Sequence, residues 1–188
     1  MTVSSNLAHI DNTCAKARKQ LGLLYRHFHP AGRATLSRLY TSTVLPLLDY
    51  CACVWDPHQV MITYSNKLEA TQKFAAKLAT GLWSSSQDPV NQLNWSSLAA
   101  RRRKQKLLLC RRILLGGSII PASVFTPHPH PSPRFHHSMA LYGPNIKTLA
   151  HLHFFFPSVI KLWNKLPCDF ISVSTQATFK RMLSLVDL

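Results

Sequence analysis

A dense run of prolines sets the main limit on how this chain can fold. Pro121, Pro127, Pro129, Pro131 and Pro133 lie within thirteen residues. Proline has a fixed φ and no backbone N–H, so neither a helix nor an interior strand can continue through such a run. We therefore predict an exposed loop or linker at 118–138. It would separate a helical part at 12–117 from a smaller part at 139–188.

Four helices are predicted ahead of the prolines, because apolar residues recur there every three or four positions. They cover about 12–29, 33–49, 66–80 and 97–115. Pro30 should end the first helix, and Pro46 should kink the second. One face of the second helix is predicted to pack, and it carries Leu36, Leu39, Tyr40, Thr43 and Leu47. Asn66 is the expected N-cap of the third helix, and Ser96 or Ser97 that of the fourth.

The residues after the prolines are predicted to add one short strand and two helices. The strand is expected at 152–156, where aromatic residues follow one another, and the helices at 158–166 and 175–185, the last capped by Ser174. A content of 46% hydrophobic residues is enough for a core of ordinary domain size. The predicted fold class is therefore mostly α: a helical bundle, a proline-rich linker and a small α-rich C-terminal part with at most a short strand.

The chain is strongly basic, and one segment holds much of the charge. Its 22 Lys and Arg against seven acidic residues give a net charge of +15. Such a surface attracts polyanions. The segment 101–120 contains no acid and seven basic side chains, namely Arg101, Arg102, Arg103, Lys104, Lys106, Arg111 and Arg112.

The positions of these basic residues favour contact with phosphates. Positive charge in the first turns of a helix is disfavoured by the helix dipole. At 100° per residue, the four residues from Arg101 to Lys104 point in four directions, so one protein face cannot neutralise them all. We predict that the seven side chains, together with Lys16, Arg18 and Lys19 of the first helix, bind nucleic acid without base-sequence preference. A solvated charge run is the alternative.

The tryptophans are predicted to be packing anchors. Aromatic side chains also stack on bases in proteins that bind single strands. Each tryptophan here lies beside apolar neighbours at the boundary of a predicted element, which favours burial. We therefore expect structural roles for Trp55, Trp95 and Trp163, and the same applies to Trp83.

The acidic residues do not form a pattern that supports catalysis. Two-metal phosphoryl transfer needs clustered carboxylates, yet the chain has one Glu and six Asp, with no adjacent pair and no Asp-x-Asp. No nucleophile elbow is present either. We expect no enzymatic activity from this chain alone and no cofactor.

The histidines and cysteines do not predict a metal site. His128, His130, His136 and His137 lie in the proline-rich stretch without a nearby carboxylate, and His151 and His153 follow. The five cysteines are an odd number at spacings that fit neither disulfides nor zinc. Reduced thiols, with no signal peptide and no membrane span, predict a nuclear or cytoplasmic protein that is not secreted.

Three sequence blocks carry a resemblance to a known family. They are Leu-Pro-Leu-Leu-Asp-Tyr-Cys at 45–51 running into Trp-Asp-Pro at 55–57, Leu-Asn-Trp-Ser-Ser-Leu at 93–98 followed by three arginines, and Leu-Trp-Asn-Lys-Leu-Pro at 162–167. In this order, with an amphipathic helix ahead and a Phe-Lys helix behind, the chain resembles the C-terminal third of non-LTR (LINE-type) retrotransposon reverse transcriptases.

The resemblance implies a function and a place in a larger polymerase. The helices at 15–28, 34–48 and 67–79 would correspond to the thumb, which grips the template–primer duplex, and the later part to a C-terminal extension. The palm with its paired aspartates would be missing. The chain would then be a catalytically incomplete fragment of an RNA-directed DNA polymerase. A nucleic-acid-binding or protein-interaction module used by the host, and a decayed reading frame, are the alternatives.

Overall fold

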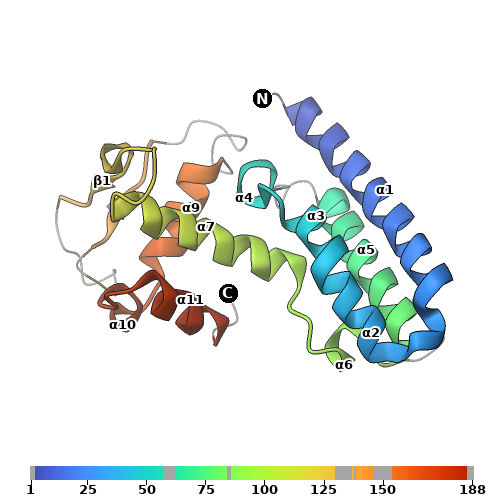
Figure 1. Ribbon diagram of the computed structural model, residues 1–188. Coiled ribbons are helices and arrows are strands. Elements are labelled where there is room, and N and C mark those ends of the chain that lie inside the picture. The colour runs from blue at the N-terminus through green and yellow to red at the C-terminus, as the bar shows by residue number, and fades with distance from the viewer. Residues whose placement is uncertain are drawn as a thin grey trace. The chain divides into compact units, whose positions relative to one another are not determined.

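The computed structural model describes residues 3–56, 62–83, 86–129, 137, 139–145 and 154–185. It is mostly α-helical and includes a two-stranded antiparallel sheet, which confirms the predicted fold class (Figure 1). The chain divides into an N-terminal unit, Met1–Arg102, and a C-terminal unit, Arg103–Leu188. This boundary lies within helix α7 (Leu98–Leu114), whereas the sequence predicted a boundary at the proline-rich stretch.

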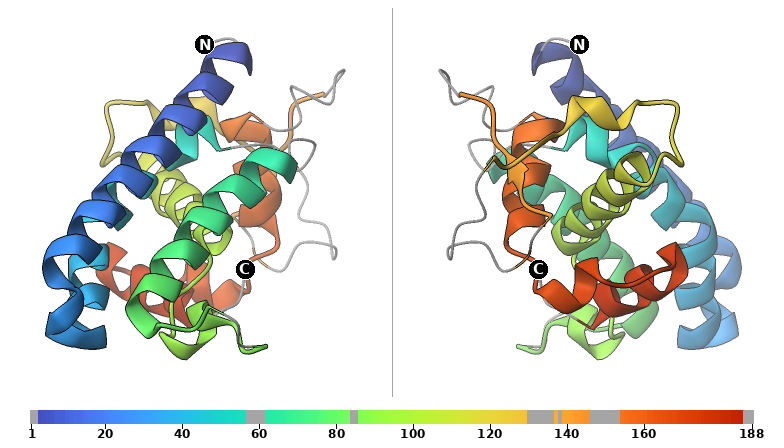
Figure 2. Two further views of the ribbon diagram at one scale, coloured as in Figure 1. Left: turned by 90° about the vertical axis from the view of Figure 1, so that its right-hand side faces the viewer. Right: turned by 90° about the vertical axis from the view of Figure 1, so that its left-hand side faces the viewer.

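The N-terminal unit is a helical bundle. Helices α1 and α5 contact each other and cross at an angle (Figure 2), and α2 packs against both. The elements of the unit, besides the start of α7, are α1 (Val3–Phe28), the 3-10 turn η1 (His29–Ala31), α2 (Gly32–Leu39), the π-helical segment η2 (Tyr40–Val44), α3 (Leu45–Asp49), α4 (Ala52–Trp55), α5 (Ile62–Thr80) and α6 (Pro89–Gln92).

Two of these helices begin earlier than predicted. In α1 the buried residues Ile10, Cys14, Ala17 and Leu21 recur at helical spacing, so the packed face extends upstream of the predicted start at residue 12. Helix α5 begins at Ile62, which places Asn66 inside the helix. The prediction that Asn66 is an N-cap is therefore wrong.

Pro46 changes the face that the second predicted helix buries. Its ring would clash with the carbonyl of residue 42, and it has no N–H to donate. The chain widens into η2 just before it, and Leu45 N–H bonds to the carbonyl of Tyr40, five residues back. A π-helical turn contains one more residue than an α-helical turn, so the side chains after it are rotated around the helix axis by about the angle between two successive residues. Leu48 is therefore buried, while Leu47, predicted to pack, is 42% exposed.

The C-terminal unit is built on the second part of α7. Leu107, Cys110 and Ile113 of α7 form its core with side chains from the segments that follow α7 in the chain. Gly116, at φ +71°, ends α7 close to the predicted position. The other elements are η4 (Ala122–Val124), β1 (Thr126–Pro127), β2 (Leu141–Tyr142), α9 (Phe155–Asn164), α10 (Cys168–Ile171) and α11 (Gln176–Ser184).

Part of the predicted linker belongs to this unit. Phe125 is buried in the core, and β1 pairs with β2 in the register Thr126 with Tyr142 and Pro127 with Leu141. The prediction of an irregular stretch is therefore wrong for 122–127. Pro127 is tolerated because an edge strand leaves one side of its backbone unpaired. Residues 130–136 and 138 lie outside the described residues.

Two predictions for the last third of the chain also need correction. Phe155 and Phe156 open helix α9, so the strand predicted at 152–156 is wrong for these two residues; 152 and 153 lie outside the described part. Helix α11 is capped by Thr175, whose side-chain oxygen accepts a hydrogen bond from Thr178 N–H at 3.1 Å. Ser174 was the predicted cap. The helices predicted at 158–166 and 175–185 are otherwise confirmed within a few residues.

The Leu-Trp-Asn-Lys-Leu-Pro block joins α9 to strand β2. Trp163 is 2% exposed, and its indole N–H donates to the carbonyl of Met139 at 3.0 Å. The side chain of Asn164 accepts from Leu141 N–H at 2.9 Å and donates to Leu141 O at 2.8 Å. It therefore satisfies the strand backbone as a neighbouring strand would. Trp163 is thus buried and hydrogen-bonded, and its anchoring role stays a prediction.

The other tryptophans are anchors to different degrees. Trp55 is 5% exposed and donates to the carbonyl of Tyr50 at 2.7 Å. Trp95 is partly buried and stacks on Tyr40, with ring centroids 4.2 Å apart. Trp83, in contrast, is 52% exposed and touches Phe74 edge-on. The packing prediction is thus confirmed for Trp55 and Trp95 but wrong for Trp83.

Replacing Trp163 by Ala should lower the free energy of unfolding of the C-terminal unit by about 3–5 kcal/mol, because the change leaves a cavity and an unpaired Met139 carbonyl. Urea denaturation followed by circular dichroism measures the loss. Trp83→Ala is the matched control and should change stability much less, since that side chain is half-exposed. Equal losses in the two variants would contradict the anchoring role of Trp163.

Candidate nucleic-acid interface

The first arginines of α7 form ion pairs within the N-terminal unit. Arg101 Nε donates to both carboxylate oxygens of Asp49, at 3.0 and 3.3 Å, and its Nη2 donates to the same carboxylate. Arg102 Nε donates to Asp56 at 2.6 Å, and its Nη2 lies 3.4 Å from Ser65 Oγ. The Arg102 side chain is 3% exposed and that of Arg101 is 36% exposed. Both guanidinium groups therefore have protein carboxylates as partners.

A third carboxylate caps α7. Glu69, the single glutamate of the chain, accepts hydrogen bonds from the N–H groups of Leu98 at 3.2 Å and Ala99 at 2.8 Å. Ser97 Oγ accepts from Ala100 N–H at 3.1 Å, which confirms Ser97 as the predicted cap. Negative charge at this helix end is favourable. Together, Asp49, Asp56 and Glu69 offset the positive charge that the sequence places there.

Farther along α7, two more basic side chains are buried in the C-terminal unit. Lys106 is 5% exposed, and its Nζ donates to Ser158 Oγ at 3.2 Å. Arg111 donates to the carbonyls of Phe170, at 3.3 Å, and Val173. Its guanidinium carbon lies 4.7 Å from the centre of the Phe179 ring, and burial lowers its pKa. These groups hold α7 against the rest of the unit.

The structure therefore corrects the predicted phosphate-binding set. Arg102, Lys106 and Arg111 are wrong as phosphate ligands, because their charged groups are buried and bond to the protein itself. Arg103 and Lys104 are half-buried. Arg112 is exposed, and its Nε donates to the carbonyl of Gly117 at 2.6 Å. The α7 run is mainly a structural element.

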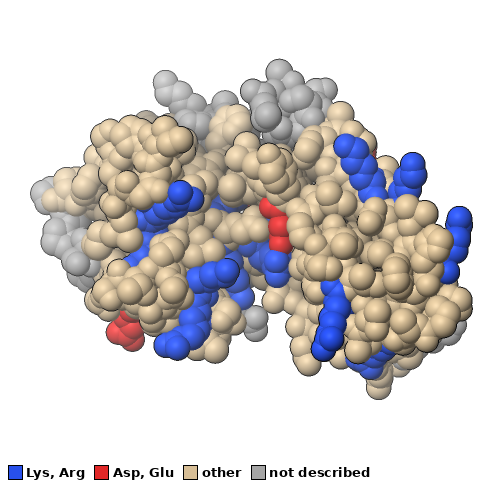
Figure 3. Space-filling view, viewed as in Figure 1, with Lys and Arg blue, Asp and Glu red and all other residues tan. Residues whose placement is uncertain are grey.

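A different part of the chain presents exposed positive charge to solvent, and of its members Arg33 also donates to the carbonyl of Gln92 at 2.7 Å. Residues 12–48 contain no acid, and their six Lys and Arg side chains are all exposed. Figure 3 shows Lys and Arg standing separately along the right-hand edge, over α1 and α2 as labelled in Figure 1. We call this set the α1–α2 basic surface; its members are Lys16, Arg18, Lys19, Arg26, Arg33 and Arg38.

Three members of this surface line the outer face of α1. Lys16, Lys19 and Arg26 lie, at 100° per residue, on the side opposite the buried Cys14 and Leu21. Such spacing lets them reach successive phosphates of one backbone.

The acids of the N-terminal unit are engaged elsewhere. Asp11 pairs with Lys67 at 2.5 Å, and Asp88 caps α6 by accepting from Val90 N–H at 3.2 Å. The remaining three are Asp49, Asp56 and Glu69, which hold the start of α7. The charge of the α1–α2 basic surface is thus left without acids of its own.

The predicted residues Lys16, Arg18 and Lys19 belong to this surface, whereas Arg26, Arg33 and Arg38 were missed. The sequence prediction was based on the local density of Lys and Arg, which is highest at 101–112. A count of acids over a longer window would have found the surface, because 37 successive residues, 12–48, lack any.

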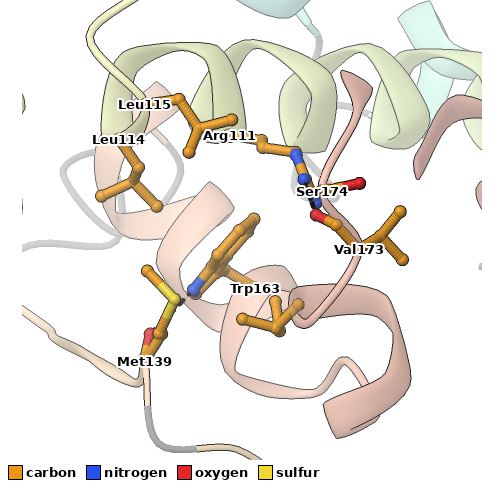
Figure 4. Close-up of a pocket in the computed structure, with 8 residues that line it drawn as sticks. Arg111, Leu114, Leu115, Met139, Trp163, Val173 and Ser174 are labelled. Carbon is orange, nitrogen blue, oxygen red and sulfur yellow. Dashed lines mark hydrogen bonds between the residues drawn. The ribbon is translucent and has the colours of Figure 1, made fainter. Parts of the chain in front are cut away.

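A pocket lies in the C-terminal unit (Figure 4). It is a cavity of about 170 Å³ with the Trp163 indole and the Arg111 side chain in its wall, surrounded by Leu114, Met139 and Val173. Among the described residues, its lining includes no carboxylate, histidine or cysteine. The pocket is therefore an apolar recess beside a buried cation, without groups for acid–base chemistry.

The thiols and histidines do not form a metal-binding cluster in the described residues. All five cysteines are free; burial raises the pKa of Cys110 to about 12 and also raises that of Cys14, so both stay protonated. His137 is buried, with Nε2 2.9 Å from the carbonyl of Trp163. No group of three metal-ligating side chains occurs in the described part. His130, His136, His151 and His153 lie outside it.

Comparison with protein-family models, with curated proteins and with solved structures finds no match for this chain. Across the described ranges, no helix has the length and apolarity needed to cross a membrane. The functional assignment therefore depends on the charge, burial and geometry of the chain itself.

Replacing Asp56 by Ala should lower the free energy of unfolding by about 3–5 kcal/mol, because it leaves Arg102 buried without its carboxylate. Thermal and urea denaturation measure the effect. Asp11→Ala is the matched control: it removes an ion pair whose side chains are 46% and 43% exposed, and should change stability little. If Asp56→Ala were as stable as Asp11→Ala, Arg102 would not need its partner and the structural role of the pair would be wrong.

Proposed function

We propose that this chain binds the phosphate backbone of nucleic acid through the α1–α2 basic surface, as a thumb-like, catalytically incomplete part of a LINE-type reverse transcriptase. The observation that carries the proposal is the set of six exposed cations within an acid-free stretch of 37 residues. Each phosphate contact releases counterions, which supplies affinity without reading base sequence. Nucleic acid is accordingly the proposed partner, in the nucleus or cytoplasm.

Contacts between two of the three sequence blocks support a structural role for these blocks. The 45–57 block and the 93–103 block meet in the N-terminal unit through the pairs Asp49 with Arg101 and Asp56 with Arg102. Trp95 of the second block stacks on Tyr40, just before the first block. Residues that make such long-range contacts stabilise the fold of the helical bundle. The proposal therefore assigns the blocks to structure and the α1–α2 basic surface to binding.

The proposal assigns no catalysis to the chain. Three of its seven acids are bound at the start of α7. Asp49 and Asp56 accept hydrogen bonds from Arg101 and Arg102, and Glu69 accepts from helix N–H groups. Carboxylates engaged in this way are not available to hold two metal ions. In the proposed polymerase, the catalytic aspartates would come from the palm.

The proposal predicts a salt-dependent affinity that depends on α1. Binding of an RNA–DNA hybrid, measured by fluorescence anisotropy at several salt concentrations, should weaken steeply as salt rises. Replacing Lys16, Lys19 and Arg26 together by Gln should reduce the log–log salt slope by up to about 2.7, at about 0.9 per phosphate contact.

A matched control tests whether the location of the charge matters. Replacing Lys161, Lys165 and Lys180 by Gln removes the same number of exposed charges from the C-terminal unit. We expect the slope to stay close to that of the parent chain. A flat salt dependence of the parent, or an equal loss in both triple variants, would contradict binding by the α1–α2 basic surface.

A further inference from the structure

One face of α1, continued by the first residue of η1, combines a cation with two exposed rings. Arg18, Gly22, Tyr25 and His29 follow one another at spacings of four, three and four residues, which places them within about 60° on a helix. Tyr25 and His29 are exposed, and their ring centroids are 5.3 Å apart with planes tilted by 35°. We call these four residues the Arg18–His29 face. It lies beside the line formed by Lys16, Lys19 and Arg26.

The glycine in this face is not required by the fold. Gly22 lies in the interior of α1, where glycine destabilises a helix relative to alanine. A Cβ built at this position meets no atom within 4 Å, and its backbone does not have a positive φ. Neither packing nor backbone conformation therefore explains it. The missing side chain leaves the helix surface open between Arg18 and Tyr25, where another chain can approach closely.

We propose that the Arg18–His29 face binds single-stranded nucleic acid. An unpaired base stacks on the rings of Tyr25 and His29, Arg18 bonds to a phosphate, and the strand passes over Gly22. This inference rests on the proposed function, because the neighbouring cations supply the general attraction for the backbone. It adds that the surface distinguishes unpaired bases from a duplex.

Charge and exposure together favour this occupant. The nearest acid on the same side of α1 is Asp11, and Lys67 already pairs with it. Phe28, the last residue of α1, adds a further exposed ring, 42% exposed. Exposed rings set among cations without acids match a chain that offers both phosphates and flat base faces. The bases of a duplex have their faces covered by their neighbours and cannot stack in this way.

The test compares two single strands of equal charge. Fluorescence anisotropy would measure binding of the full chain to a short oligo(dT) and to an abasic strand with the same number of phosphates. The parent chain should bind oligo(dT) more tightly. Tyr25→Ala should weaken oligo(dT) binding about tenfold, within the range expected for loss of one stacked base, and leave binding of the abasic strand unchanged.

Two further variants separate binding from folding. Tyr142→Ala is the matched control, because Tyr142 is also an exposed tyrosine in contact with a histidine, His128, and should bind oligo(dT) like the parent chain. Gly22→Gln introduces a better helix former, so its melting temperature should be unchanged or higher while oligo(dT) binding weakens. If Gly22→Gln is no less stable than the parent chain, unfolding cannot explain its weaker binding.

The outcomes separate this inference from the proposed function. Equal binding of oligo(dT) and the abasic strand, or unchanged binding by Tyr25→Ala and Gly22→Gln, would overturn base stacking and leave phosphate binding intact. If the parent chain bound neither strand nor the RNA–DNA hybrid, the proposed function itself would fail. If Tyr25→Ala altered the oligomeric state in light scattering but not oligo(dT) binding, the face would be an interface between copies of this chain.

Discussion

The buried pair of Arg102 and Asp56 is the interaction on which the N-terminal unit most depends. A guanidinium group that is almost fully removed from water is tolerated only with a carboxylate and further hydrogen-bond acceptors around it. Asp56 and Ser65 supply them, while Asp49 binds the adjacent Arg101. These contacts fix the start of α7 against the segment that follows α3. The arginines therefore determine how the bundle closes.

This constraint divides the positive charge of the chain between two roles. Basic side chains of α7 such as Arg102 and Arg111 are buried and hold helices together, through a carboxylate in one unit and through carbonyl groups in the other. The acids of the N-terminal unit are engaged elsewhere, so the cations of the α1–α2 basic surface stay exposed; one of them, Arg33, donates to the carbonyl of Gln92 at 2.7 Å. The basic residues behind the net charge of +15 thus have two roles: some form a buried structural network, and others form the exposed α1–α2 basic surface.

The helices could be predicted from the sequence because their signals are local, whereas the partners of the arginines could not. Asp49 and Asp56 lie 52 and 46 residues before Arg101 and Arg102, so no local pattern links them. The face of the second helix was predicted from a regular 3.6-residue period, and the π-helical segment ahead of Pro46 changed its phase. The acid-free stretch at 12–48, in contrast, can be read directly from the sequence.

Lysine acetylation footprinting tests the division of charge most directly. The full chain would be acetylated with and without a saturating RNA–DNA hybrid, and each lysine followed by mass spectrometry. We expect Lys16 and Lys19 to react in the free chain and to be protected in the complex, while the buried Lys106 reacts slowly in both. Unchanged acetylation of Lys16 and Lys19, together with protection of Lys104 in α7, would contradict this division of charge.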